Sequence, residues 1–339
     1  MKEIDLHEFN YLPPGIQACT AKNIHHHLPG PSLIHLAGKK TEPLFISILQ
    51  HGNEAVGLYA LQTLLSAYEN QPLPRSVSIF IGNVQAAQFG MRRLDHQPDF
   101  NRMWPSKMMD HDLPEARLMR QVWEIMRQRK PFASIDLHNN TGLNPHYACI
   151  NRLDNRFYHL ATMFSQQVVY FIQPLGVQSM AFAELCPSVT LECGHVDDKA
   201  GIDHAFEYLD ACLQLSEIPN SSMALTDMDL YHTVATVKVP QEFTFSYEDS
   251  TQDIYFSPEL EKYNFIETEK GSLFALTHPD KTVRLKVYNE EGEDVASEYF
   301  DSSNNEIRLM KTVMPSMITS NEKVIRQDCL CYLMERYPF

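Results

Sequence analysis

The chain has 339 residues, of which 44% are hydrophobic and 21% are charged. Such a chain can bury a substantial core, and its length suggests about two domains. The 28 Lys and Arg residues stand against 43 Asp and Glu residues, giving a formal charge of −15. A field of that sign repels phosphate backbones, which argues against nucleic acid as a partner. No apolar run approaches the ~18 residues that a membrane helix needs, so no membrane association is expected.

The cysteines indicate a reducing compartment. There are seven, an odd number, and none forms a C-x-x-C pair. A disulfide framework or a cysteine zinc site is therefore not expected. The cysteines are expected to be reduced thiols. Residues 1–10 contain no apolar signal-peptide core. A cytoplasmic location is the resulting expectation.

Short apolar runs alternate with helical periodicity over the first two-thirds of the chain. The run from Leu44 to Leu49 is short, apolar and bounded by Pro43 and Gly52, which is typical of a buried strand. Further strands are predicted at 76–81, 133–137 and 189–191, and helices at 56–68, 118–126 and 202–213. Strands that alternate with helices favour an α/β fold, with a mainly parallel mixed sheet flanked by helices.

The pattern changes near residue 220. A polar stretch at 218–222 is a candidate linker, and short strands separated by turns follow it. These strands are predicted at 234–239, 243–247, 272–277, 283–288, 307–310 and 329–333, with turns at 289–292 and 301–305. We therefore expect an α/β domain at residues 1–220 and a smaller, mostly β C-terminal domain at residues 221–339.

Polar, metal-competent side chains follow the predicted N-terminal strands. The first strand leads into His51-Gly-Asn-Glu54, the third into Asp136-Leu-His138, and the fourth into Glu192. The segment after the second strand contains several charged and amide side chains: Arg92, Arg93, Asp99, Asn101 and Arg102. In open α/β sheets, sites form beyond the carboxyl ends of the strands. The sequence therefore predicts that these side chains share one site.

Two imidazoles and one carboxylate form a common catalytic zinc set that leaves a position for water. His51 and Glu54 flank a tight turn, so they can reach the same ion, and His138 would join them from a neighbouring strand end. A further carboxylate must then take the proton of the water and pass it to the leaving nitrogen. Glu192 is the candidate, because it is not needed as a ligand.

Together these motifs resemble a known family. His51-Gly-Asn-Glu54, Asp99-Phe-Asn-Arg102, Asp136-Leu-His138 and Leu191-Glu-Cys-Gly194 have the order and spacing of the succinylglutamate desuccinylase/aspartoacylase family. That family is a branch of the zinc carboxypeptidase superfamily, and the resemblance covers roughly residues 40 to 215. It implies a zinc carboxypeptidase-like fold and one Zn²⁺ per chain.

The resemblance also implies roles for individual residues. His51, Glu54 and His138 would hold zinc, and Glu192 would be the general base and acid. An arginine upstream of the Asn-Arg pair would polarise the scissile carbonyl. Arg93 fits this role best, with Arg92 as the alternative one residue away.

The Asn-Arg pair of the family clamps the free carboxylate of the amino-acid part of the substrate, which assigns that role to Asn101 and Arg102. A planar guanidinium can grip a carboxylate through two parallel hydrogen bonds. Asp99 would then orient a metal ligand or an arginine.

One stretch departs from the family. Aspartoacylases use a further arginine shortly before the catalytic glutamate, but residues 173–190 contain no Arg or Lys and only one charge, Glu184. Either a basic residue of the C-terminal domain substitutes, or the protein does not take N-acetylaspartate or N-succinylglutamate. We favour the second. Leu175, Val177, Met180 and Phe182 in this stretch fit an apolar acyl pocket or core packing equally well.

The sequence as a whole favours a zinc-dependent hydrolase that cleaves the amide bond of an N-acyl amino acid. A metallo-carboxypeptidase acting on short peptides would use the same residues and is the first alternative. A metal-containing binding protein without catalysis is the second. The expected partner is a small N-acyl amino acid or short peptide, with no nucleic acid or membrane, and a homo-oligomer is possible.

Overall fold

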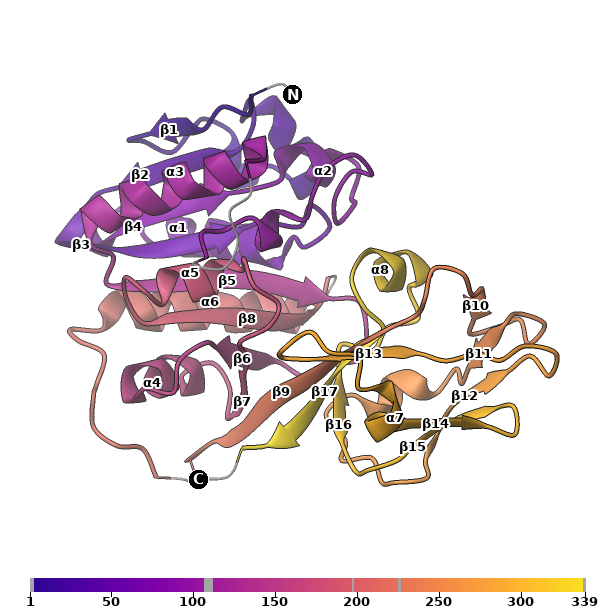
Figure 1. The fold of residues 1–339 in the computed structure, drawn as a ribbon. Coiled ribbons are helices and arrows are strands. Elements are labelled where there is room, and N and C mark those ends of the chain that lie inside the picture. Colours follow the sequence, from indigo (N-terminus) through magenta and orange to yellow (C-terminus); the bar gives the residue numbers. More distant parts are fainter. Residues whose placement is uncertain (1–2, 107–111, 197, 225–226, 338–339) are drawn as a thin grey trace. The chain divides into compact units, whose positions relative to one another are not determined.

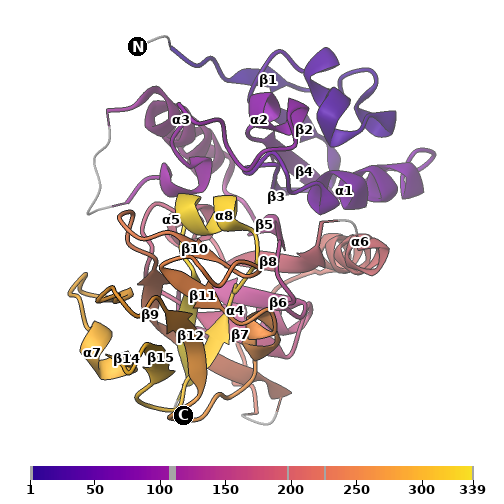
Figure 2. The same cartoon turned by 90° about the vertical axis from the view of Figure 1, so that its right-hand side faces the viewer.

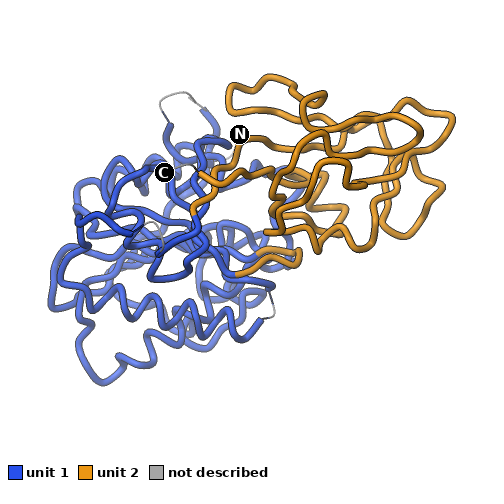
Figure 3. The backbone as a smooth tube through the Cα atoms, turned by 90° about the horizontal axis from the view of Figure 1, so that it is seen from below, with its two compact units in different colours: residues 1–139, 146–229 blue, residues 140–145, 230–339 orange. Residues whose placement is uncertain are grey.

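The computed structural model describes residues 3–106, 112–196, 198–224 and 227–337 (Figure 1). The chain forms two compact units (Figure 3). Unit 1 comprises residues 1–139 and 146–229, and unit 2 comprises residues 140–145 and 230–339. These units are defined by contacts between residues, whereas the boundary predicted at residue 220 separates independently folding domains. That boundary stays a prediction.

Unit 1 contains a mixed, mainly parallel sheet, as the sequence predicts. Its strands have the order β1-β2-β4-β3-β5-β8-β6-β7. The pairs β1/β2, β3/β4, β3/β5 and β6/β7 are parallel, whereas β2/β4 and β6/β8 are antiparallel. The strand bounds are β1 His7–Phe9, β2 Ser32–Leu36, β3 Gly38–Ile48, β4 Leu73–Ile81, β5 Ala133–Asn140, β6 Tyr147–Ile150, β7 Gln167–Tyr170 and β8 Ser188–His195.

Helices cover both faces of this sheet (Figure 2). They are α1 Val56–Ala67, α2 Val84–Gln88, α3 Pro114–Arg129, α4 Asn155–Thr162, α5 Gln178–Phe182 and α6 Lys199–Gln214, with short 3₁₀ turns that include η3 Phe100–Arg102. Phe45 of β3 belongs to a core cluster with α3 and stacks on Phe182 of α5 at a centroid distance of 4.3 Å. Ile48, on the opposite face of β3, lies against Gly57 of α1, and α1 packs beside α6. Among the described residues, no helix combines the length and apolarity needed to cross a membrane.

Two strands extend further than the sequence predicts, and this matters for the site. β5 continues past Leu137 to Asn140, and β8 continues past Leu191 to His195. The apolar pattern ends earlier because the following residues are polar, yet every residue of β5 is buried. His138 and Glu192 therefore lie within strands and not in the loops after them. The sequence also missed β1, β2, β6, β7 and α4.

Unit 2 is mostly β. One set of strands has the order β13-β9-β17-β16, and a second sheet has the order β10-β11-β12-β15-β14. The strands are β9 Asp229–Lys238, β10 Phe245–Ser246, β11 Ile254–Phe256, β12 Leu273–Thr277, β13 Lys286–Asn289, β14 Phe300–Ser303, β15 Glu306–Leu309, β16 Met314–Ser316 and β17 Cys331–Arg336. Short helices α7 Ala296–Tyr299, η5 Leu260–Tyr263 and α8 Glu322–Gln327 complete it.

The predicted turn at 301–305 is partly wrong. Its first residues belong to β14, which pairs with β15 in an antiparallel hairpin. The turn itself is confined to Asn304 and Asn305, which have φ values of 54° and 61°. Asparagine tolerates this left-handed conformation, so the reversal needs only these two residues.

A short segment after β5 belongs to unit 2 by its contacts. The Thr141 hydroxyl donates to the Thr319 hydroxyl at 3.0 Å, and the backbone N–H of Met317 donates to Oδ1 of Asn144 at 2.9 Å. A Cβ atom on Gly142 would lie 1.9 Å from the carbonyl oxygen of Ile318. Only glycine therefore allows the two backbones to approach so closely.

Candidate metal centre and active site

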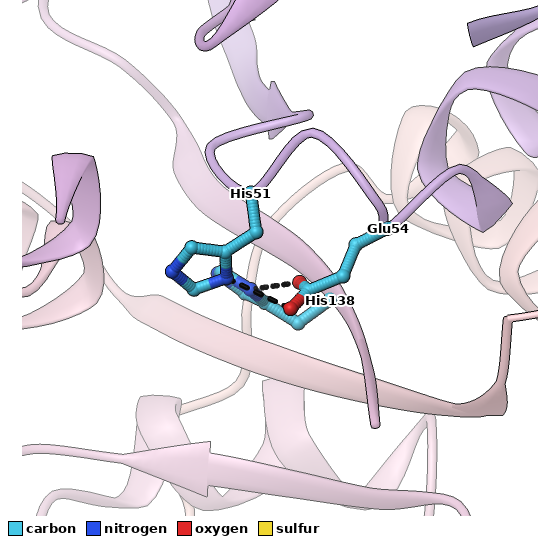
Figure 4. Close-up of side chains that lie close together, drawn as sticks. All are labelled: His51, Glu54 and His138. Carbon is cyan, nitrogen blue, oxygen red and sulfur yellow. Dashed lines mark hydrogen bonds and ion pairs between the residues drawn. The ribbon is translucent and has the colours of Figure 1, made fainter. Parts of the chain in front are cut away.

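The structure brings His51, Glu54 and His138 together (Figure 4). His51 and Glu54 lie in the loop between β3 and α1, and His138 lies in β5, the parallel neighbour of β3. One ligand atom of each residue lies within 4.8 Å of the others, and all three side chains are buried. Gly52 makes the loop possible, because a Cβ there would lie 2.2 Å from the backbone nitrogen of Ala87.

The two imidazoles face the carboxylate of Glu54 with the same ring atom. Nδ1 of His51 is 2.8 Å from Oε1 of Glu54, and Nδ1 of His138 is 2.6 Å from Oε2. The opposite nitrogens have their own carboxylates: Nε2 of His51 is 2.9 Å from Asp99, and Nε2 of His138 is 2.7 Å from Asp136. An Nε2–H donated outward leaves the Nδ1 lone pair facing inward, as a metal ligand requires. Two imidazoles and a carboxylate so arranged fit a zinc ion.

The electrostatics of this cluster favour a positive charge at its centre. Burial lowers the pKa of His138, but the charges of Asp136 and Glu54 outweigh it and hold that pKa well above its usual range. Burial raises the pKa of Glu54, but the charges of His51 and His138 hold it below its usual range. The carboxylates around the imidazoles therefore stabilise a cation here, whether protons or a metal ion.

The two candidate arginines lie in different surroundings. Nη2 of Arg92 is 2.9 Å from Oδ2 of Asp99, and its Nη1 is 3.5 Å from Oε1 of Glu54. Arg93 instead donates from Nη1 to the backbone carbonyl of Gln97 at 2.9 Å. Arg92 is thus the arginine that contacts the acidic side chains of the cluster.

Asp99, Asn101 and Arg102 are placed by η3. Asp99 caps this turn by accepting from the backbone N–H of Asn101 at 2.9 Å. The Asn101 amide is buried: its Nδ2 is 3.2 Å from Asp136, and its Oδ1 accepts from the backbone N–H of Gln178 at 2.8 Å. Arg102 is half-buried and donates from Nη1 to the Asn101 carbonyl at 2.9 Å. Of the predicted clamp, Arg102 is the more accessible side chain.

Glu192 lies in β8, the neighbour of β5 in the sheet. Its carboxyl group is buried, and Oε2 has no hydrogen-bond partner among the described residues. Burial raises the pKa of Glu192 to about 7; the charge of His138 lowers this pKa and that of Glu54 raises it. A carboxyl group in this state can accept and return a proton near neutral pH.

The stretch before Glu192 is more a part of the core than an acyl pocket. Phe182 is fully buried and stacks on Phe45, and Val177 is also buried. Leu175 and Met180 are half-buried, and Glu184 is exposed. The basic side chain of Arg152 reaches the carbonyl oxygen of Ala183 at 2.7 Å.

Three further residues join the site that the sequence did not single out. Asp136 was noted only as part of a motif, although its position two residues before His138 places both on one face of β5. Gln50 donates from Nε2 to Asp136 at 2.6 Å, and Trp104 donates from Nε1 to Oε1 of Gln50 at 2.5 Å. Nothing in the sequence pattern marks Gln50 or Trp104, because their role depends on long-range contacts.

Comparison with known proteins agrees with this geometry. Residues 41–208 match the succinylglutamate desuccinylase/aspartoacylase catalytic domain. No curated protein sequence matches the chain. Among solved structures, succinylglutamate desuccinylase from Chromobacterium violaceum has 14% sequence identity and a TM-score of 0.59, with 89% of this chain and 86% of that chain covered.

Two further structures share the fold. Murine aminoacylase 3 has 16% identity and a TM-score of 0.57, over 89% of this chain and 97% of that chain. The product-bound ectoine utilization protein EutE from Ruegeria pomeroyi has 16% identity and a TM-score of 0.55, over 89% and 88%. Through the catalytic domain at residues 41–208, the chain belongs to the succinylglutamate desuccinylase/aspartoacylase family.

Proposed function

We propose that the protein is a zinc-dependent hydrolase that cleaves the amide bond of an N-acyl amino acid, with one zinc ion held by His51, Glu54 and His138. The observation that carries the proposal is the pairing of this buried donor set with Glu192, whose carboxyl group is buried on the neighbouring strand and has an oxygen without a partner among the described residues. A metal site alone fits a binding protein, whereas an adjacent carboxyl group with a pKa near 7 fits hydrolysis.

When bound, zinc would polarise the scissile carbonyl and lower the pKa of a water molecule towards ~7. Glu192 would accept a proton from the attacking water molecule and return it to the leaving nitrogen. The guanidinium of an arginine beside the cluster would stabilise the oxyanion that develops on the carbonyl. Arg92 is better placed for this than Arg93, because its guanidinium contacts Glu54 and Asp99.

Arg102 binds the α-carboxylate of the substrate in this scheme. The residue is half-buried, and its Nη1 donates to the carbonyl of Asn101. Asn101 contributes to the clamp through its backbone, because its side-chain amide is bonded to Asp136 and Gln178. A planar guanidinium can grip the carboxylate through two hydrogen bonds.

The acyl group is uncharged in our proposal. The stretch before Glu192 has no basic residue, and the nearby Arg152 lies at the wrong end of β6. Tyr147 is the register partner of Glu192 on this strand, and Arg152 is five residues further along. β6 ends at Ile150, so Arg152 follows the end of the strand that is opposite to Tyr147. These positions argue against a second carboxylate on the acyl side.

The test is a substrate panel. Zinc-loaded protein is incubated with N-acetyl, N-butyryl and N-succinyl amino acids, N-acetylaspartate and dipeptides, and release of free amine is measured with and without a chelator. We expect chelator-sensitive release from N-acyl amino acids with uncharged acyl groups, restored by added zinc. Release from dipeptides alone would identify a carboxypeptidase. Tight zinc binding without any release would identify a binding protein.

A further inference from the structure

Asp136 is the centre of a buried hydrogen-bond network in unit 1. Its carboxylate is fully buried and lies within hydrogen-bond distance of three nitrogen atoms. Nε2 of Gln50 is 2.6 Å from Oδ1, Nε2 of His138 is 2.7 Å from Oδ2, and Nδ2 of Asn101 is 3.2 Å from Oδ2. The direction of these bonds decides which nitrogen of His138 carries a proton, and therefore which one can bind a metal.

Trp104 fixes the direction of the first bond. Its indole Nε1 is buried 2.5 Å from Oε1 of Gln50. An indole N–H can donate but cannot accept, so Gln50 must turn its oxygen towards Trp104. The amide nitrogen of Gln50 then necessarily faces Asp136 and donates to it.

The backbone of Gln178 fixes the direction of the second bond in the same way. Its N–H donates to Oδ1 of Asn101 at 2.8 Å, so Nδ2 of Asn101 faces Oδ2 of Asp136 at 3.2 Å and Nε2 of His138 at 3.0 Å. A backbone N–H is also only a donor. Asp136 thus receives a fixed donor, Gln50, on Oδ1, and the amide nitrogen of Asn101 faces Oδ2.

The third contact is the shortest on Oδ2. Nε2 of His138 lies 2.7 Å from this oxygen, and an Nε2 without hydrogen would place two lone pairs against each other, so the hydrogen lies on Nε2 of the imidazole. The lone pair of His138 is then on Nδ1, the atom that faces Glu54 at 2.6 Å. His51 is oriented differently, by Asp99 and the guanidinium of Arg92.

We propose that Trp104 and Gln50, supported by Asn101, are positioning residues that set the tautomer of His138 and turn its Nδ1 lone pair towards the metal. The inference rests on the proposed function only in the identity of the ion. None of the three touches the substrate in this role; they act through Asp136. Partners of this kind commonly change metal affinity 10- to 100-fold when removed.

Trp104→Phe tests the proposal, with Trp123→Phe as its matched control. Trp123 is the other tryptophan of the chain, packs against the same core cluster, and donates from Nε1 to the Ala181 carbonyl at 3.0 Å. Both variants lose an indole hydrogen bond, but only Trp104 leads to Asp136. Zinc affinity is measured by competition with a chromogenic chelator. We expect about tenfold weaker binding in Trp104→Phe and unchanged binding in Trp123→Phe.

Gln50→Met supplies a second variant that keeps the side-chain length. It should weaken zinc binding at least as much as Trp104→Phe does. The double variant should bind zinc as tightly as Gln50→Met alone, because both residues act through the same series of hydrogen bonds. The ¹⁵N shifts of the His138 imidazole in the zinc-loaded protein provide a spectroscopic measure, with Nε2 protonated in the wild type.

Four results would decide the matter. Weaker zinc binding in Trp104→Phe and Gln50→Met, with both variants as folded as Trp123→Phe by thermal unfolding, would support the inference. Equal zinc affinity in Trp104→Phe and Trp123→Phe would overturn it, as would fully additive losses in the double variant. A wild-type protein that binds no zinc would instead refute the proposed function, so the two failures are distinguishable.

Discussion

Nε2 of His51 lies 2.9 Å from Oδ1 of Asp99, although the two residues are 48 positions apart in the chain. The other oxygen of the same carboxylate receives Nη2 of Arg92 at 2.9 Å. Burial raises the pKa of Asp99, but the charges of His51 and Arg92 outweigh it and hold that pKa well below its usual range. One charged carboxylate therefore orients a candidate metal ligand and an arginine together.

Asp99→Asn tests this relationship. The amide has nearly the same shape but no charge, so it should orient His51 less firmly and weaken zinc binding about 10- to 100-fold. Chelator competition measures the affinity, and Asp95→Asn, an exposed aspartate on the same segment, is the control. Unchanged zinc affinity in Asp99→Asn would contradict the role.

Arg92→Gln and Arg93→Gln form a matched pair that separates the two arginines. Because Arg92 contacts Glu54 and Asp99, its loss should lower kcat about 10²-fold or more, as removal of an oxyanion-stabilising group does. Loss of Arg93, which bonds the Gln97 carbonyl, should change kcat less than about fivefold. Steady-state kinetics on the best N-acyl substrate would decide between them. A larger loss of kcat in Arg93→Gln than in Arg92→Gln would assign the role to Arg93.

Glu192→Gln should abolish turnover while the metal stays bound. The glutamine cannot accept the proton of the attacking water, and the expected loss is about 10²- to 10⁴-fold in kcat. Metal content by mass spectrometry should remain one zinc per chain, because Glu192 is not a ligand. Glu207→Gln, an exposed glutamate on α6, serves as the control. Wild-type turnover in Glu192→Gln would rule out the mechanism.

The pH dependence of kcat/KM should report Glu192. Burial raises its pKa to about 7, and a general base works only when ionised. Activity should therefore fall as the pH drops through that pKa, with a slope of one in log kcat/KM. The charge of a bound cation lowers the pKa of Glu192, so the midpoint should lie at or below pH 7 in the zinc-loaded enzyme. A profile without an acidic limb between pH 4 and 7 would contradict this assignment.

Arg102→Met should raise KM with little effect on the chemical step. The methionine keeps the apolar stem but loses the guanidinium that would bind the α-carboxylate. The comparison is an N-acyl amino acid against its carboxamide analogue. The wild type should prefer the acid, and Arg102→Met should lose that preference. An undiminished preference in the variant would place the carboxylate elsewhere.

The regular parts of unit 1 were predictable because their apolar pattern is strong. Residues 44–48 of the predicted strand Leu44–Leu49 form the last part of β3, and the helical periodicity after Val56 is that of α1. The shorter strands were missed: β6, for example, has four residues, too few for periodicity to show. β5 was predicted too short because its last residues are polar and buried, a combination that hydropathy cannot distinguish from a loop, and β8 because the charged Glu192 ends its apolar run.

The site was predictable in part because its motifs lie at the ends of strands with a strong apolar pattern. His51 and Glu54 follow β3, and His138 lies near the end of its neighbour β5, so their convergence follows from the sheet order. The contacts around them are different, because each joins residues that are distant in sequence. The bond from Trp104 to Gln50 spans 54 positions, and no spacing rule indicates it. The preference for Arg92 over Arg93 likewise depends on where two adjacent side chains point.

The segment from Asn140 to Pro145 makes the chain pass between the two units three times, at 139/140, 145/146 and 229/230. A single cut therefore cannot separate them. A fragment ending near residue 229 would keep all the proposed metal ligands, but Thr141 and Asn144, a few residues beyond His138, would lose Thr319 and Met317. Residues 141–144 belong to unit 2 and need its later residues as partners, so a shortened chain should expose hydrogen-bonding groups that the full chain satisfies.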